Sequence, residues 1–197
     1  MSPRPLKVSD DEVFAAAQRA MERLGPSELT LADIADEAGL TAGALVHRFG
    51  SKRELLLTLA NQWGGSAKQM MDGLRSQHAS PLAVVRAYAE CMALLAKSPD
   101  ALARNLAYLQ IDLIDPDFRK PMLTNARATR KELESLIGEA VDARELRKDT
   151  DVRSLALSVE TVVSGALLTW ALHREGAPAA WMRARVDAIL APHLTKR

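Results

Sequence analysis

A short segment near the N-terminal end combines basic residues with a helix start that lacks acids. From residue 39 to residue 53 the charged residues are all basic, namely Arg48, Lys52 and Arg53. Thr41 can cap a helix that begins at the next residue. Three positions later stands Ala44, where a carboxylate would have strengthened the cap. Because the free N–H groups at a helix start attract anions, this pattern is suited to contacting phosphate groups.

Residue types that serve catalysis or metal binding are scattered along the chain. No glycine-rich phosphate loop is found, and four histidines lie apart without a partner at metal-ligand spacing: His47, His78, His173 and His193. Cys91 is the single cysteine, in an apolar stretch without a nearby base, which predicts a buried free thiol in a reducing compartment. The sequence therefore predicts no catalytic residue, no metal and no cofactor. An enzyme whose site is assembled by folding stays open as an alternative.

The composition limits the class of protein. Of the 197 residues, 48% are hydrophobic and 4% are aromatic, and the excess of Ala and Leu favours an all-α fold. The net charge of +1 is low for a nucleic-acid binder, but the acids crowd the segments before residue 38. The first residues carry charges and prolines, and no later apolar run approaches membrane-spanning length. We expect a soluble, cytoplasmic protein with no membrane partner.

Helix-start signals recur in the first third of the chain. A hydroxyl residue is followed three positions later by a carboxylate at Ser9, Thr30 and Ser51. The apolar spacing predicts helices over residues 13–24, 31–38 and 42–49. Gly39 can take the left-handed conformation that separates the second helix from the third. Two helices joined by a short glycine turn form a helix-turn-helix arrangement.

The stretch LTLADIADEAGLTAGALVHRFGSKRELLLTLA, residues 29–60, resembles the DNA-binding signature of the TetR (tetracycline-repressor-like) family. The resemblance rests on an ordered set of residues: Ile34-Ala35, Ala38-Gly39, Phe49 and Ser51-Lys52. It departs from the family at Val46, where a Tyr is usual.

The resemblance implies an all-α DNA-binding transcriptional regulator. We expect an N-terminal three-helix helix-turn-helix domain over residues 1–50 and a larger helical ligand-binding and dimerisation domain over residues 51–197. The family usually acts as a homodimer on a palindromic operator in double-stranded DNA, as a repressor that a small-molecule effector releases. The alternative is a helical enzyme or ligand-binding protein that contains a helix-turn-helix-like hairpin without a DNA function.

The resemblance also suggests which residues contact DNA. The predicted set is Thr30, Thr41, Ala42, Gly43, Ala44, His47, Arg48 and Lys52. Thr41, His47 and Lys52 are expected near phosphates, and Arg48 near base edges or sugars. The small residues 42–44 would let the helix end approach the DNA closely. For Arg4 and Lys7, in the acid-free tail, the favoured interpretation is a solvated tail, with minor-groove or phosphate contacts as the alternative.

The remainder of the chain is predicted to be a helical body. A candidate helix over residues 53–75 contains Gly64-Gly65, a weak point that could act as a hinge. Further helices are expected over residues 81–97, 99–114, 151–173 and 178–194. Between them, a long helix is expected to run to about residue 144, with its regular part beginning near Pro121.

Polar residues within these apolar helices suggest a region that binds a small-molecule effector, because burying them without partners is unfavourable. The predicted ligand-binding residues are Trp63, Met70, Tyr88, Met92, Asn105, Tyr108, Leu109, Asp112 and Thr161, with Glu160 as a further polar candidate. For each of them, an ordinary core or surface position is the alternative.

The last two helices resemble the family's dimerisation pair. A broad apolar stripe is formed by Leu155, Val159, Val162, Val163, Ala166, Leu167 and Trp170, and the final helix carries Trp181, Val186, Ile189 and Leu190. Two such helix pairs can form a four-helix bundle across a two-fold axis. In the alternative, both stripes belong to the core of a single chain.

Overall fold

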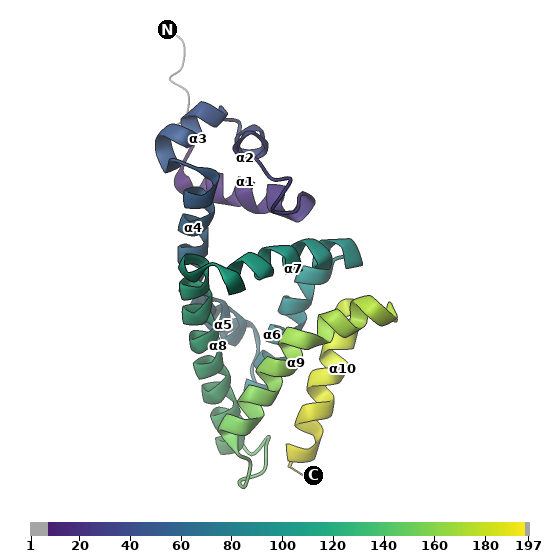
Figure 1. Cartoon of the computed structure of the whole chain (residues 1–197). Helices are drawn as coiled ribbons and strands as arrows, with labels where there is room; N and C mark the ends of the chain where they lie inside the picture. The colour runs from purple at the N-terminus through teal and green to yellow at the C-terminus, as the bar shows by residue number, and fades with distance from the viewer. Residues whose placement is uncertain (1–7, 196–197) are drawn as a thin grey trace. The chain divides into compact units, whose positions relative to one another are not determined.

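The computed structural model describes residues 8–195 (Figure 1). These residues form an all-α fold. The β-structure among them is one isolated antiparallel bridge, between Leu146 and Leu194. The elements are α1 (Asp10–Arg23), α2 (Leu31–Ala38), α3 (Ala42–Phe49), α4 (Lys52–Trp63), α5 (Ser66–Gln77), α6 (Pro81–Ala93), η1 (Leu94–Ala96), α7 (Pro99–Ile114), α8 (Pro116–Asp142), α9 (Val152–His173), α10 (Pro178–Leu190) and η2 (Ala191–His193). The predicted fold class is confirmed.

The chain divides into two compact units. Unit 1 contains residues up to 62 together with residues 103–120, and unit 2 contains residues 63–102 and 121 onwards. These limits differ from the expected domain boundary between residues 50 and 51, because α4 and most of α7 group with the N-terminal helices. The compact units are defined by packing. The expected boundary after residue 50 divides a DNA-binding domain from a ligand-binding domain, and it stays a prediction.

Unit 1 is built around the first four helices. Its core is formed by apolar side chains from α1, the loop before α2, α2, α3 and α4: Val13, Phe14, Ala17, Ala20, Leu29, Ile34, Ala35, Leu45, Leu55 and Leu59. Tyr108 from α7 packs against this cluster. A single core therefore holds the helix-turn-helix and the helix that follows it.

Unit 2 contains the larger core, to which α5, α6, α8, α9 and α10 contribute. Leu133, Leu136 and Ile137 of α8 and Met182 of α10 are fully buried there. The stripe predicted for dimerisation lies largely in this core, since Leu155, Val159 and Val163 are among its buried residues. These three residues therefore serve the core of the chain itself, while a dimer interface through the last two helices stays a prediction.

The predicted helix over residues 53–75 is two helices. α4 ends at Trp63 and α5 begins at Ser66, whose hydroxyl donates a hydrogen bond of 2.9 Å to the Trp63 carbonyl. At Gly64 an added Cβ would lie 3.2 Å from the carbonyl oxygen of Pro121, so the two backbones meet closely there. The glycine pair therefore ends a helix.

The start of α8 also differs from expectation. The helix begins at Pro116 and continues through Pro121, so the expected regular start near Pro121 is wrong. The Asp115 carboxylate accepts a hydrogen bond of 3.0 Å from the backbone N–H of Asp117, which stabilises the first turn. Pro121 follows soon after, and it removes the single backbone hydrogen bond that its own N–H would have made.

α9 is long and apolar enough to cross a membrane by length and composition. It has 22 residues, and its most apolar window has a mean hydropathy of 1.6. This corrects the expectation that no apolar run approaches membrane-spanning length. The helix supplies buried residues to the core of unit 2, and core helices pass the same test of length and composition.

Candidate nucleic-acid interface and effector site

The turn between α2 and α3 sets the direction of the third helix. Gly39 has a φ of 67°, in the left-handed region that a residue without Cβ adopts at little cost. The Thr41 hydroxyl then accepts a hydrogen bond of 3.2 Å from the Ala44 N–H, as the sequence predicted. The first turn of α3 contains no acid. α3 therefore begins with a capped N-terminus that carries no negative side chain.

One face of α3 is buried and the other is exposed. Leu45 is fully buried, and the ring of Phe49 packs 5.6 Å from the ring of Phe14, measured between centroids. Five of the predicted DNA-contacting residues are exposed on this helix or at its cap: Thr41, Gly43, Ala44, His47 and Arg48. Ala42 is half-buried and packs against the core of unit 1. Val46, which the prediction left out, is 49% exposed.

Arg48 contacts the start of α1. Its Nη1 donates a hydrogen bond of 2.7 Å to the Val8 carbonyl, Nη2 pairs with the Asp10 carboxylate, and the guanidinium lies over the Phe49 ring. The structure thus places this side chain within unit 1, where it ties α3 to α1. A direct contact between Arg48 and base edges stays a prediction.

Lys52 is also engaged within unit 1. Its Nζ donates hydrogen bonds of 3.0 Å to the Pro26 carbonyl and 2.6 Å to the Leu29 carbonyl. Both carbonyls belong to the loop between α1 and α2, so the ammonium group holds this loop against the start of α4. This position supports the scaffold of the hairpin, and the predicted phosphate contact is untested.

Thr30 caps α2 through reciprocal hydrogen bonds with Asp33. Its hydroxyl donates a 2.6 Å hydrogen bond to the Asp33 carboxylate, and the Asp33 N–H donates in return at 3.2 Å. The hydrogen bond from Thr30 is the main reason that the pKa of Asp33 lies below its usual value. α2 thus begins with an ionised carboxylate, in contrast to α3. Arg4 and Lys7 lie outside the described residues.

The segment 103–120 is bound to the N-terminal helices by polar contacts that sequence reasoning missed. Arg53, directly after Lys52, pairs with Asp115 at 2.8 Å and with Asp117 at 2.7 Å. Tyr108 donates a hydrogen bond of 2.9 Å to the Leu24 carbonyl, and Arg104 donates one of 2.9 Å to the Glu22 carbonyl. The partners are more than 60 positions apart in the sequence, so no local pattern could reveal them.

Two models of one family match this chain, in the same order as the elements just described. Residues 13–59, which contain the helix-turn-helix, match the model for bacterial regulatory proteins of the tetR family. Residues 107–186 match the tetracyclin repressor-like C-terminal domain. The chain belongs to the TetR family. The family that the motif in residues 29–60 indicated is therefore confirmed.

Curated relatives are similar over the helix-turn-helix. The HTH-type transcriptional regulator TtgR of Pseudomonas putida is 44% identical over 48 residues, which are 24% of this chain and 23% of that protein. The probable regulator ArpR of Pseudomonas putida matches with the same figures. The match thus spans about a quarter of the length of these relatives.

Solved structures show the same fold over nearly the whole chain. A TetR regulator from Haloarcula marismortui has a TM-score of 0.73 at 20% identity, with 94% of this chain and 98% of that chain covered. FadR of Bacillus subtilis, solved in complex with stearoyl-CoA, has a TM-score of 0.70 at 17% identity, with 93% and 98% covered. SmeT, the repressor of a Stenotrophomonas maltophilia multidrug efflux pump, has a TM-score of 0.68 at 20% identity, with 96% and 92% covered.

The predicted effector-binding residues are divided between the two units. Trp63, Met70, Tyr88, Met92 and Thr161 belong to unit 2, whereas Asn105, Tyr108, Leu109 and Asp112 belong to unit 1. Trp63 is 42% exposed, Met70 and Met92 pack beside the core of unit 2, and Tyr88 is buried within it. In unit 1, Leu109 is half-buried, and burial raises the pKa of Asp112. The additional candidate Glu160 accepts a hydrogen bond of 2.6 Å from Arg130.

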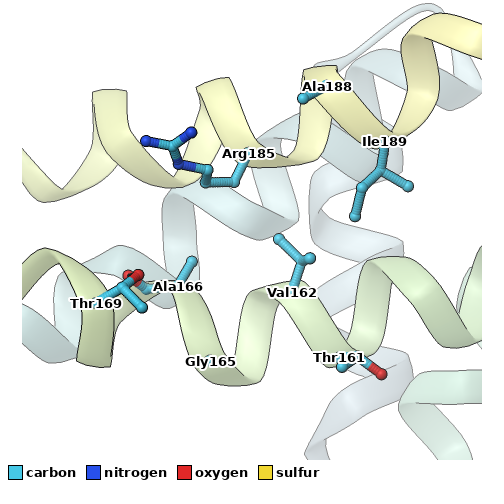
Figure 2. A pocket seen from close by; sticks show the side chains of 8 residues that line it. All are labelled: Thr161, Val162, Gly165, Ala166, Thr169, Arg185, Ala188 and Ile189. Atoms are coloured by element: carbon cyan, nitrogen blue, oxygen red, sulfur yellow. The ribbon is translucent and has the colours of Figure 1, made fainter.

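A groove in unit 2 runs between α9 and α10 (Figure 2). Its lining residues are Thr161, Val162, Gly165, Ala166, Thr169, Arg185, Ala188 and Ile189. Val162 and Ile189 extend into the space between the two helices, and small residues leave the backbone of α9 accessible near Gly165. Thr161 is the member of the predicted effector set that lines this groove.

α9 carries a second apolar stripe, which faces outward. Leu157, Leu168 and Leu172 are 48%, 50% and 76% exposed. With Thr161 and Gly165 between them, their spacing of about four residues per step places them on one side of the helix. α9 therefore presents one apolar side to the core of unit 2 and another to solvent.

Proposed function

We propose that this TetR-family protein is a DNA-binding transcriptional regulator that reads double-stranded operator DNA with α3. The observation that carries the proposal is the start of α3, which is capped by Thr41, free of acids and flanked by exposed small residues. Such an N-terminus can approach phosphates closely. Val46 is an exposed apolar residue that can contact a thymine methyl group in the major groove. We place the protein in the cytoplasm, where such a regulator meets DNA.

The DNA-facing set that we propose is Thr41, Gly43, Ala44, Val46 and His47. Arg48 and Lys52 support this surface from within unit 1, where they hold α1 and the loop before α2.

A single substitution separates DNA binding from folding. Ala44→Glu places a carboxylate at the third position of α3, where it can complete a capping box with Thr41 and stabilise the helix. The same carboxylate repels phosphates. Unfolding stability is expected to stay equal or rise, while affinity for a DNA fragment from the protein's own promoter falls at least about tenfold, through charge repulsion at a helix terminus.

Fluorescence anisotropy with that fragment and a scrambled fragment measures the change. Ala79→Glu is the matched control, since it adds the same charge at an exposed residue between α5 and α6. Equal losses in the two variants, or wild-type affinity in Ala44→Glu, would remove the start of α3 from the interface.

We further propose that the protein acts as a homodimer through α9 and α10. The support is the outward apolar stripe of α9 together with the groove lined by Gly165 and Ala166, where a second copy can approach the backbone closely. Two α3 helices related by a two-fold axis would enter successive major grooves, about 34 Å apart or a multiple of it. The operator is then a palindrome, and the regulator acts as a repressor that an effector bound in the helical body releases.

A further inference from the structure

The helix-turn-helix carries little positive charge for a surface that meets DNA. Residues 31–49, which form α2, the turn and α3, contain one side chain with a permanent positive charge, that of Arg48. The same residues contain three carboxylates, those of Asp33, Asp36 and Glu37. Affinity for DNA depends strongly on cations that neutralise phosphates. The partner of the Arg48 guanidinium therefore has a direct influence on how tightly this hairpin can bind.

Arg48 borders the surface that we assign to DNA. It follows the exposed Ala44 by four residues, so both lie on one side of α3. The Arg48 side chain keeps 28% of its accessible area, which places it at the edge of this surface and outside the core. A phosphate that approaches α3 on this side can reach the guanidinium.

In the free protein this guanidinium is already bound to an anion. Nη1 donates a hydrogen bond of 2.7 Å to the Val8 carbonyl, and the group lies 5.4 Å from the centroid of the Phe49 ring. Nη2 pairs with the Asp10 carboxylate. Asp10 is the charged partner among these three, and its oxygens accept as phosphate oxygens do. Asp10 thus takes the place that a phosphate would need.

The ion pair can open without loss of α1. The Asp10 side chain is 57% exposed, and ion pairs at such exposure contribute little to stability. The start of α1 has its own cap, because the Ser9 N–H donates to the Glu12 carboxylate at 2.6 Å and the Glu12 N–H donates to the Ser9 hydroxyl at 3.2 Å. Without Arg48, the Asp10 carboxylate still interacts favourably with the free N–H groups of the first helical turn.

A phosphate has an advantage over Asp10 as the partner of Arg48. The planar guanidinium has five N–H donors, so it can bind a phosphate and keep its hydrogen bond to the Val8 carbonyl. Both anions satisfy the charge, but neutralising a phosphate also releases counterions from the DNA. The exchange therefore favours the DNA-bound state, while the loss of the contact with Asp10 reduces the gain.

We propose that Asp10 is an autoinhibitory residue, which holds Arg48 in the DNA-free protein and is replaced by a DNA phosphate when α3 binds. The proposal rests on the proposed function and goes beyond it, because Arg48 becomes a phosphate contact whose availability Asp10 controls. Asp10 acts through Arg48 and is a positioning residue. Operator affinity is then limited by one ion pair within unit 1.

A double-mutant cycle in the full-length protein tests the exchange. Fluorescence anisotropy with the fragment from the protein's own promoter gives the affinities of the wild type, Asp10→Asn, Arg48→Met and the double variant. Asp10→Asn is expected to raise affinity about two- to fivefold, which corresponds to the strength of an exposed ion pair. Adding Asp10→Asn to Arg48→Met is expected to give no such gain, because the two residues act through one contact.

Asp11→Asn is the matched control. Asp11 is exposed in the same turn of α1, and no ion pair joins it to another residue between 8 and 195. Its substitution removes the same charge, so any gain in affinity is expected to be smaller and to be equal with and without Arg48. Equal gains for Asp10→Asn and Asp11→Asn, or a loss of affinity in Asp10→Asn, would overturn the proposal.

The dependence of affinity on salt separates a phosphate contact from a structural role. Arg48→Met is expected to reduce the slope by roughly one unit, and Arg48→Lys, which retains the charge, is expected to keep it. An unchanged slope in Arg48→Met overturns the exchange. If Arg48→Met does not fold, the comparison of Asp10→Asn with Asp11→Asn decides alone.

The wild type distinguishes the two levels of the proposal. If it does not bind the promoter fragment in preference to a scrambled one, the proposed function fails and the exchange fails with it. If it binds specifically while Asp10 and Arg48 show no coupling in the cycle, the exchange alone fails.

Discussion

At the scale of single residues, the pKa of each of the two tyrosines reflects how deeply that side chain is buried in its unit. Tyr88 lies in the core of unit 2 and Tyr108 packs against the core of unit 1, and they are the two tyrosines of the chain. Burial raises the pKa of each to about 12, and for Tyr88 the charge of Glu160 adds to the effect. Tyrosinate formation can therefore be read without interference from other tyrosines.

We expect both hydroxyls of the folded protein to titrate near pH 12 instead of the usual 10.0. Because the folded pKa is the higher one, the contribution to stability is fully present below pH 10. It is lost as the pH rises from 10 towards 12. Ultraviolet absorbance of tyrosinate measures this, and the urea-unfolded protein supplies the ordinary titration. Half of the tyrosinate signal appearing near pH 10 in folded protein would contradict the burial of one tyrosine.

Lys52 offers a second test at this scale. Because its ammonium group holds two loop carbonyls, Lys52→Met should lower the free energy of unfolding by about 1–3 kcal/mol. The dependence of operator affinity on salt should keep its slope, since no phosphate contact is lost. Urea unfolding and anisotropy at several salt concentrations measure the two effects. A slope reduced by roughly one unit, with unchanged stability, would make Lys52 a phosphate contact after all.

At the scale of elements, the junction of α4 and α5 depends on one of its two glycines. Gly64 faces the backbone of Pro121, whereas a Cβ at Gly65 would meet nothing within 4 Å. Gly65 also has a φ of −108°, which other residues adopt. A substitution at Gly64 therefore tests close packing against Pro121, and a substitution at Gly65 tests backbone flexibility alone.

Gly64→Ala is expected to destabilise the protein by about 1–3 kcal/mol, because the new methyl group meets backbone atoms that cannot move aside easily. Gly65→Ala should change stability by less than about 1 kcal/mol. Urea unfolding of both variants checks this. Equal stabilities would show that α8 can shift at Pro121.

If Gly64-Gly65 is also a hinge, Gly65→Ala should reduce the effect of a bound ligand on operator affinity while leaving ligand affinity unchanged.

The contacts of Arg53 link elements that are distant in sequence. Arg53 is the second residue of α4, and its guanidinium donates hydrogen bonds to Asp115 and Asp117 at the junction of α7 and α8. The hydrogen bond from Arg53 is the main reason that the pKa of Asp115 lies below its usual value, so the contact between Arg53 and Asp115 joins two ionised groups at neutral pH. The helix-turn-helix and the segment 103–120 therefore belong to one compact unit.

At the scale of the whole molecule, the exposed stripe of α9 makes the dimer testable. Leu168→Glu places a charge in the middle of this stripe, next to the groove, and is expected to give a monomer that has lost operator binding. Leu94→Glu is the matched control, since Leu94 is 64% exposed in η1, away from α9 in the sequence. Light scattering gives the oligomeric state. A wild-type monomer that still binds the operator specifically, or a dimeric Leu168→Glu, would refute this interface.

Local sequence signals were sufficient where the structure depends on neighbours in the chain. The caps at Ser9, Thr30 and Thr41 and the turn at Gly39 follow from backbone chemistry within four residues, and α2 and α3 have the predicted bounds. The all-α class follows from composition and spacing in the same way. The family follows from an ordered set of residues within one short segment, so its recognition required no tertiary information.

Tertiary structure decided which side of each helix is used and which charges are paired. The spacing of α9 allowed two apolar stripes, and only packing shows that Leu155 and Val159 face the core while Leu157 and Leu168 face solvent. Arg48 and Lys52 read as free cations, yet their partners lie 23 to 40 residues away along the chain. The burial of Thr129 and of the Asn125 Oδ1 atom likewise depends on packing between helices. Side-chain partners at long sequence separation depend on the arrangement of whole helices, and local propensity carries no record of that arrangement.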